Sequence, residues 1–363
     1  MISSIPITPP LFPLSGTLAA VEEHIPGALV SPSARAQIEI SAAAIPAAAV
    51  HNTFLECRLT AEDRVDLIVG IDVRGREALT MPTRGQSTTD ATRLRSFGLG
   101  PGDLWRHWTD PRSILRHHVE RLWLEFDADR SPATSASEPT EPVIFAELRQ
   151  DATQTAGYRR DLVFNVANHL AGQMFDPGSH RAIGRCLAAL PAGAAVRYLG
   201  SLAARGQEVA RLSVIGLRRA DVLTYLRAIA WPGSLLELRD QLADTWEGSD
   251  SQPEFAVLNL DVGKEIRPAL GLEFRLERRC QTAGRIAETG WIQSLVAQAY
   301  CTPLKALALS AWPGCSRAVL PHELWPSVIC RRVNHFKLTY RPGQPAEWKA
   351  YLSFSHRPAS KER

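Results

Sequence analysis

The stretch 334–354 most constrains what this chain can fold into, because apolar and polar residues alternate along two segments separated by a turn. Such alternation predicts the two strands of a β-hairpin, since successive side chains of a strand point to opposite faces. One face would carry Phe336, Leu338, Trp348, Ala350 and Leu352. The other would carry His335, Lys337, Thr339, Glu347, Lys349, Tyr351 and Ser353. This polar row must face either water or a polar lumen.

Four earlier pairs of segments show the same hairpin pattern. They span residues 54–60 with 65–73, 122–127 with 143–149, 196–200 with 209–215, and 255–261 with 269–276. The stretch 130–142 inside the second pair is rich in Ser, Pro, Thr and Glu, which is typical of a surface connection. After the second hairpin, apolar residues recur with helical spacing over 161–173, 180–190, 220–229, 235–246, 284–300 and 303–311. The repeating unit is therefore strand, strand, helix, helix.

A repeated motif supports this unit, because Ala-Trp-Pro-Gly follows a helical segment at both 230–233 and 311–314. Five hairpins supply ten antiparallel strands, and closing them into a barrel removes the exposed edges of an open sheet. We therefore predict an α+β fold, a ten-stranded antiparallel β-barrel of five ββαα units with a ring of outer helices. The expected parts are an N-terminal helical lead (1–53), a single barrel domain (54–354) and a polar tail (355–363). The alternative is a chain of two domains divided near 130–142.

The polar strand faces would line the lumen of such a barrel, because the apolar faces must meet the helices. Ten strands enclose more space than an eight-stranded core filled by its own side chains, so a ligand-sized lumen is expected. Glu56 and Arg58 face inward if Leu55, Cys57 and Leu59 face outward, and Glu147 and Arg149 face inward if Ile144, Ala146 and Leu148 face outward. The other expected lumen residues are Arg211, Ser213, Asn259, Asp261, Glu273, Arg275, Lys337, Thr339, Lys349 and Tyr351. The alternative is that these residues form cross-strand ion pairs on a solvated sheet face.

This arrangement resembles the ABBA-type, or prenyltransferase-barrel, aromatic prenyltransferases, and in particular their dimethylallyltryptophan synthase branch. In that branch, the second strands of the hairpins carry Lys-x-Tyr patterns that hold a prenyl diphosphate and screen the allylic cation. The dyad Lys349 and Tyr351 matches this pattern, and Arg211 and Arg275 supply only its cationic part. Glu56 stands where the branch places a catalytic glutamate. The second hairpin departs from the pattern, with Glu-Leu-Arg at 147–149.

The resemblance implies transfer of an allylic prenyl group from a prenyl diphosphate to an aromatic or peptide side-chain acceptor. The implied diphosphate-binding residues are Arg58, Arg149, Arg211, Arg275, Lys337, Lys349 and Tyr351. Fixed cations in a water-poor lumen would stabilise the leaving diphosphate, and the faces of Tyr351 and Trp123 would stabilise the allylic cation. Glu56 and Glu125 are the catalytic candidates, as acceptors of the proton that the alkylated acceptor loses. The alternative function is a non-catalytic barrel that binds a peptide or an anionic small molecule.

Composition argues against several other classes of protein. The formal net charge of +3 is too small for a dedicated nucleic-acid binder. The chain has no recognisable signal peptide and no apolar run that could span a bilayer, so we expect no membrane span and a cytoplasmic location. The six cysteines lack zinc-ligand spacing and are expected to be reduced and mostly packed, and no metal site is predicted. No cofactor is required by the sequence; Mg²⁺, the oligomeric state and the acceptor are left open.

Overall fold

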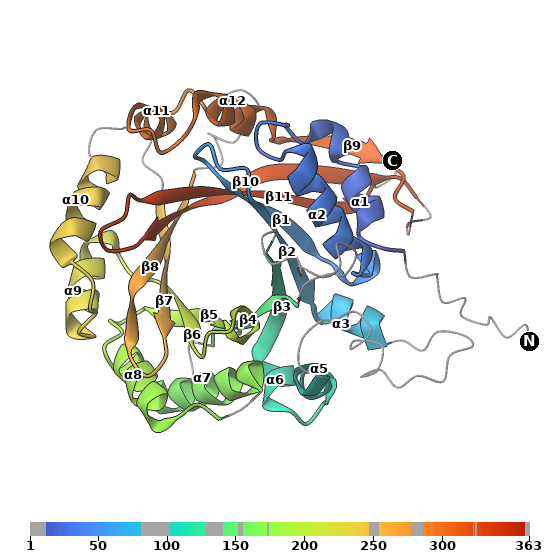
Figure 1. Cartoon of the computed structure of the whole chain (residues 1–363). Coiled ribbons are helices and arrows are strands. Elements are labelled where there is room, and N and C mark those ends of the chain that lie inside the picture. Colours follow the sequence, from blue (N-terminus) through green and yellow to red (C-terminus); the bar gives the residue numbers. More distant parts are fainter. Residues whose placement is uncertain are drawn as a thin grey trace, which may run out of the picture.

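The computed structural model describes residues 12–80, 102–127, 141–151, 155–172, 174–246, 254–276, 286–321, 323 and 325–359. Its centre is a closed barrel of ten antiparallel strands (Figure 1). The barrel strands are β1 (Asn52–Arg58), β2 (Val65–Asp72), β3 (Val119–Phe126), β4 (Val143–Leu148), β5 (Ala195–Ser201), β6 (Ala210–Ile215), β7 (Glu254–Val262), β8 (Ile266–Arg275), β10 (Ser327–Tyr340) and β11 (Glu347–Pro358). All five predicted hairpins are present and closed into the predicted barrel.

Strands from the two ends of the chain close the barrel, because β11 pairs with both β10 and β1. In this register Glu56 lies opposite Tyr351, and Arg58 lies opposite Lys349. Opposed residues in an antiparallel pair point to the same face of the sheet. The polar rows of the first and last hairpins therefore share one face, and that face lines the lumen.

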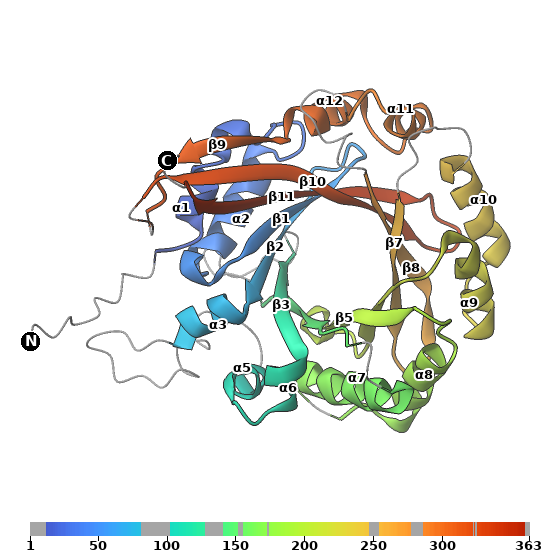
Figure 2. The same ribbon diagram turned by 180° about the vertical axis from the view of Figure 1, so that it is seen from behind.

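Helices surround the barrel and cover its outer face, as both views show (Figures 1 and 2). They are α1 (Ser15–Ala19), α2 (Pro32–Ala43), α3 (Val73–Thr80), α5 (Gly102–Thr109), α6 (Ile114–His118), α7 (Ala156–Ala171), α8 (Pro177–Ala188), α9 (Val222–Ala228), α10 (Leu235–Trp246), α11 (Gly290–Ala297) and α12 (Pro303–Ala311). The side chains of Ser31, Thr155, Asp176 and Thr302 accept hydrogen bonds from the first turns of α2, α7, α8 and α12, which explains where these helices begin. Of the helices that the structure describes, none has both the length and the apolar character needed to cross a membrane.

The main hydrophobic core lies between the barrel and this ring of helices. Trp348 on β11 is fully buried there, with its ring centroid 5.5 Å from that of Phe274 and 5.4 Å from that of Trp291 on α11. Residue 348 faces outward because it alternates with Lys349, which faces the lumen. Successive residues of β11 therefore face alternately the hydrophobic core and the lumen.

Two features of the fold differ from the sequence-based expectation. An eleventh strand, β9 (Gly314–Ala318), pairs with the first residues of β10 at the edge of the sheet. Both β10 and β11 extend beyond the barrel, where β10 pairs with β9 on one side and with β11 on the other. β11 ends at Pro358, inside the predicted polar tail. These additions escape pattern analysis because β9 has little apolar alternation.

The stretch 130–142 lies almost wholly outside the described residues, but β3 and β4 on its two sides are neighbours in the one closed sheet, which contradicts a division into two domains there.

Candidate active site

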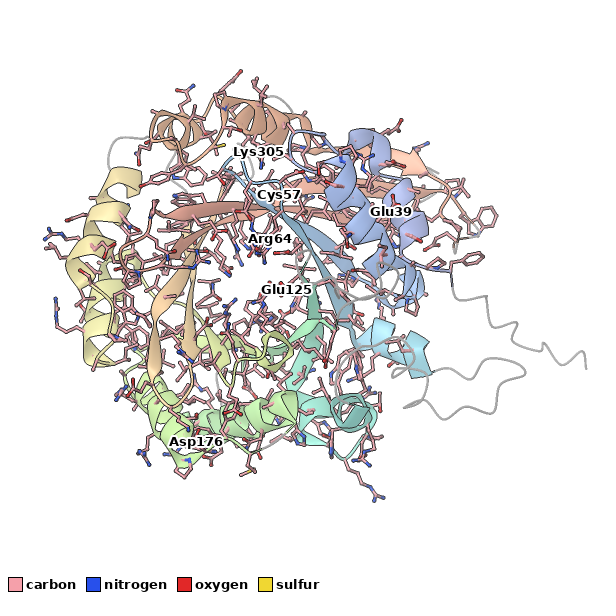
Figure 3. The ribbon with its side chains drawn as sticks, in the orientation of Figure 1. Glu39, Cys57, Arg64, Glu125, Asp176 and Lys305 are labelled. Atoms are coloured by element: carbon pink, nitrogen blue, oxygen red, sulfur yellow. The ribbon has the colours of Figure 1, made fainter. Side chains whose placement is uncertain are left out.

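The lumen holds two adjoining chambers with different chemistry. The larger has a volume of about 680 Å³ and is lined by eight arginines and lysines and six carboxylates. The smaller, of about 140 Å³, has apolar and aromatic side chains in half of its lining and polar or charged side chains in the rest. Glu125, Arg211, Asn259 and Lys337 line both chambers and form the boundary between them. Figure 3 shows Arg64 and Glu125 pointing into the ring of strands, whereas Cys57 and Lys305 lie between the strands and the helices.

Glu56 is the centre of the charged chamber. Its buried carboxylate accepts hydrogen bonds from the Lys349 ammonium, at 2.8 Å, and from the Tyr351 hydroxyl, and it lies 3.3 Å from the Arg58 guanidinium. Burial alone would raise the pKa of Glu56, but the charges of Lys349 and Arg58 outweigh burial and hold the pKa well below its ordinary value. Burial, together with the negative charge of Glu56, raises the pKa of Tyr351 well above normal, so its hydroxyl remains a donor.

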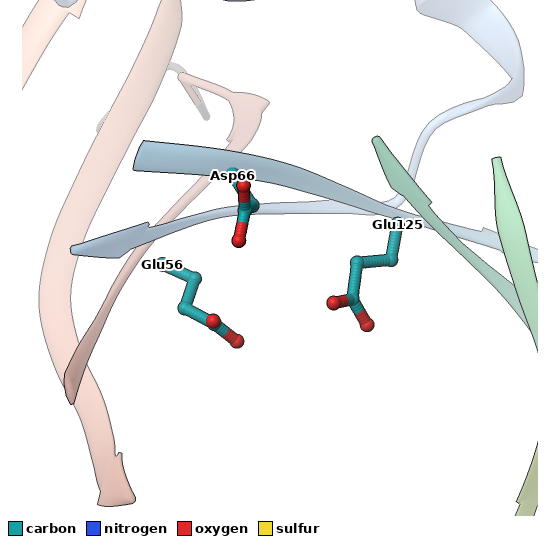
Figure 4. Close-up of side chains that lie close together, drawn as sticks. All are labelled: Glu56, Asp66 and Glu125. Atoms are coloured by element: carbon teal, nitrogen blue, oxygen red, sulfur yellow. The ribbon is translucent and has the colours of Figure 1, made fainter. Parts of the chain in front are cut away.

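Asp66 on β2 lies opposite Glu56 and binds the same arginine, accepting a 2.7 Å hydrogen bond from Arg58. Burial and the neighbouring charge of Glu56 raise the pKa of Asp66 to about 6. The carboxylates of Glu56, Asp66 and Glu125 converge, with oxygens within 4.8 Å of one another (Figure 4). Hard carboxylate oxygens of this kind suit Mg²⁺. Each of the three already accepts a hydrogen bond from an arginine or lysine, so an ion there would compete with existing ion pairs.

Carboxylates also hold two arginines of the charged chamber in place. Arg205, in the short 3-10 helix Ala203–Arg205, donates to Glu125 at 2.6 Å and to Asp127 at 2.7 Å. Arg211 on β6 makes a two-pronged contact with Asp261, at 2.6 and 2.9 Å. A bidentate contact fixes the plane of the guanidinium. These arginines are therefore oriented before any ligand arrives.

Lys337 is a cation that lines both chambers and has no ion-pair partner among the described residues. It lies opposite Glu273 and Lys349 in the sheet, yet within the described part of the chain its ammonium makes no hydrogen bond or ion pair. Burial and the charge of Arg211 lower its pKa. Gly271 makes room for this side chain, since a Cβ atom at 271 would lie 2.7 Å from the Lys337 Cε. An anion bound at the boundary of the two chambers would favour the charged form of Lys337.

The small chamber has an aromatic wall that sequence analysis did not predict as a whole. Trp123 lies with its ring 5.2 Å from that of Phe54, and its indole N–H donates to Glu147 at 3.0 Å. Tyr351 packs in the same cluster as Phe54 and Trp123, and its ring is stacked on that of His335. The remaining apolar lining comes from Ile68, Phe145, Tyr198 and Val257. Phe54, Ile68 and Phe145 occupy inward positions of their strands, where we expected only polar residues.

Eight of the nine predicted site residues line the lumen: Glu56, Arg58, Glu125, Arg211, Arg275, Lys337, Lys349 and Tyr351. Arg149 does not join them, so its expected inward position is wrong. β4 ends at Leu148, and the Arg149 side chain is 54% exposed, 3.8 Å from Glu120. The lumen cations that were not predicted, Arg64, Arg205, Arg267 and Arg341, come from hairpin turns or strand ends, where alternation gives no guide.

Comparison with known proteins assigns the fold. A scan against protein-family models found no match, and neither did a search of curated proteins. A solved 6-dimethylallyltryptophan synthase from Micromonospora olivasterospora, in complex with DMASPP and Trp, is 12% identical, with 94% of this chain and 96% of that chain covered and a TM-score of 0.51. A 5-dimethylallyl tryptophan synthase from Streptomyces coelicolor is 13% identical, with 94% and 95% covered and a TM-score of 0.49. The chain has the barrel fold of the ABBA-type aromatic prenyltransferases.

Proposed function

We propose that this protein transfers an allylic prenyl group from a prenyl diphosphate to an aromatic acceptor held in its lumen. The observation that carries the proposal is the direct contact between a cation-rich chamber and an aromatic chamber, with Lys337 and Arg211 lining both. A prenyl diphosphate has the same two-part character, an anionic head and an apolar allylic tail. The likeness of the fold to a dimethylallyltryptophan synthase supports the proposal.

The chemistry follows from where the charges lie. Breaking the allylic C–O bond leaves both bonding electrons on the diphosphate, where Lys337, Lys349 and Arg211 would stabilise the added negative charge. The allylic cation would face the rings of Tyr351 and Trp123, and each such contact contributes about 0.5–2 kcal/mol. An aromatic acceptor in the small chamber would then attack the cation away from water. Holding both substrates together in this way can lower the barrier by several kcal/mol.

The test is an incubation of the protein with a panel of prenyl diphosphates of increasing length and with tryptophan, tyrosine and peptides that contain them. We expect a product heavier than the acceptor by one prenyl group, together with release of diphosphate. An absence of product with every pair, combined with no detectable binding of diphosphate, would refute the proposal.

A second candidate function is a barrel that binds an anionic small molecule or a peptide without transforming it. The observation in its favour is that carboxylates compensate most of the lumen cations, as Asp261 does for Arg211. This function predicts that diphosphate binds, that substitution of Lys349 weakens binding, and that the ligand is recovered unchanged. Mass spectrometry of the recovered ligand separates the two functions.

The raised pKa of Asp66 predicts how diphosphate affinity depends on pH. Its carboxyl is neutral below its pKa of about 6 and charged above it, so it repels a bound diphosphate only at the higher pH. The Asp66→Asn variant should therefore match the wild type near pH 5 and bind diphosphate up to about tenfold more tightly near pH 7.5. Calorimetric titration at both pH values gives the ratio of the two dissociation constants, in which the titration of diphosphate itself cancels. A ratio of dissociation constants that does not change with pH would contradict the prediction that Asp66 titrates near pH 6 beside the bound diphosphate.

A further inference from the structure

His335 is a half-buried histidine beside Tyr351, with its side chain 15% exposed. It lies on β10 and lines the aromatic chamber. Its ring is stacked on Tyr351, with centroids 3.9 Å apart and planes at 22°. This stack holds the imidazole against the space in which an aromatic acceptor would lie.

The hydrogen bonds of His335 determine which nitrogen carries its proton. The Nδ1 atom lies 2.9 Å from Oδ1 of Asn334, an oxygen that can only accept, so Nδ1 carries the hydrogen and donates it. In the neutral ring this leaves the lone pair on Nε2. That atom is buried, and among the described residues it has no hydrogen-bond partner. A buried acceptor without a donor is unusual in proteins. Such an atom points to a catalytic role or to a ligand that supplies the missing donor.

The surroundings of His335 favour a neutral ring at rest. Burial lowers its pKa, and the charges of Lys337 on the same strand and Arg275 on β8 act in the same direction. Glu273 on β8 and Glu56 on β1 act in the opposite direction but do not reverse the shift. The imidazole is therefore able to accept a proton at neutral pH.

The site also has a partner ready for the protonated ring. The Nε2 atom of His335 lies 3.6 Å from Oε2 of Glu273, so protonation of Nε2 creates an ion pair. The other carboxylate oxygen of Glu273 accepts a 2.8 Å hydrogen bond from Asn259, whose own amide oxygen accepts one from Ser213 at 2.5 Å. This chain of contacts fixes Glu273 beside Nε2, where its negative charge stabilises the protonated ring.

The two carboxylates predicted as bases are less suited to the task. Glu56 is held by Lys349 and Tyr351, and its pKa is well below normal, so it is a weak base. Glu125 accepts a 2.6 Å hydrogen bond from Arg205. Both carboxylates serve better as anchors for the cations around them.

On the basis of the proposed function, we infer that His335 is the general base of the transfer and that Glu273 is its positioning residue. The allylic carbon forms a bond to a ring carbon of the acceptor after the C–O bond to diphosphate has broken. The same ring carbon then loses its proton to Nε2 of His335, and the C–H electron pair restores the aromatic ring. The imidazolium pairs with Glu273 until the proton passes to solvent.

The experiment compares the wild type with His335→Gln, His335→Phe and Glu273→Gln, using an acceptor deuterated at the alkylated ring carbon. We expect kcat to fall about 100-fold in both His335 variants with little change in KM, which is the lower range for loss of a general base. A deuterium isotope effect on product formation should appear in these variants, because proton loss becomes slow. The wild-type rate should fall as the pH is lowered through the pKa of His335, because the protonated ring cannot accept a second proton at Nε2. This decline should be absent from both His335 variants, and in Glu273→Gln it should shift to lower pH.

The control is His180→Gln, which removes a histidine stacked on Phe164 at the outside of the barrel. It should keep the wild-type rate, pH profile and isotope effect, and thermal unfolding of every variant shows whether the fold is retained. If the wild type is active but His335→Gln and His335→Phe keep its kcat, its acid-side decline and its isotope effect, the inference about His335 alone is overturned. If the folded wild type makes no product with any pair of substrates, the proposed function fails and the inference fails with it.

Discussion

Replacing Lys349 with alanine should lower kcat/KM for prenyl transfer about 100-fold and weaken the binding of diphosphate. The Lys349 ammonium donates to Glu56 at 2.8 Å and lies 3.6 Å from Glu347, so its loss leaves two carboxylates facing the ligand with less compensation. Truncating one partner of a buried charge pair costs about 2–5 kcal/mol, which is enough for this loss in rate. The pKa of Glu56 should also rise toward its ordinary value, since Lys349 is the cation that does most to lower it.

Steady-state kinetics and diphosphate titration of Lys349→Ala measure the effect. Lys264→Ala is the matched control, because it makes the same change at an exposed lysine outside the lumen, between β7 and β8. The control should behave as the wild type in both assays. Equal rates and equal dissociation constants for the two variants would show that Lys349 does not hold the diphosphate.

Replacing Trp348 with alanine should instead destabilise the fold, by about 3–5 kcal/mol in the free energy of unfolding. Trp348 is fully buried between β11 and α11, against Phe274 and Trp291, so its truncation opens a cavity. Trp348→Phe should lower the free energy of unfolding much less than Trp348→Ala does. The Trp348 indole nitrogen has no hydrogen-bond partner among the described residues, so phenylalanine loses no polar contact there.

Urea unfolding followed by circular dichroism gives these free energies. Trp325→Ala is the control, since the Trp325 side chain is 65% exposed and should change stability by less than about 0.5 kcal/mol. A Trp348→Ala protein as stable as the Trp325→Ala protein would contradict the assignment of residue 348 to the core. Because Trp348 and Lys349 are adjacent, the two substitutions together test whether one face of β11 supports the fold and the other the chemistry.

Much of the fold could be predicted from the sequence, because a strand has a local period. Alternation in 334–354 was sufficient to separate Trp348 from Lys349 and to place His335 beside Lys337 on the polar face. The same argument placed Glu56 and Arg58 in the lumen. It failed at Arg149, because a period of two does not say where a strand ends. It also overlooked Phe54 and Phe145, whose inward positions become an aromatic wall only when β1 to β4 lie side by side.

The last hairpin shows what each level of structure determined about this protein. The sequence by itself determined that Lys349 and Tyr351 share a polar face, since that depends only on their spacing along one strand. Only the tertiary structure decided that this face meets Glu56, almost three hundred residues earlier in the chain, and that Arg205 meets Glu125. It also decided that Nε2 of His335 lies beside Glu273 without a hydrogen-bond partner in the described part of the chain. Closure of the barrel brings these groups together, and no local pattern encodes contacts between strands so far apart in the sequence.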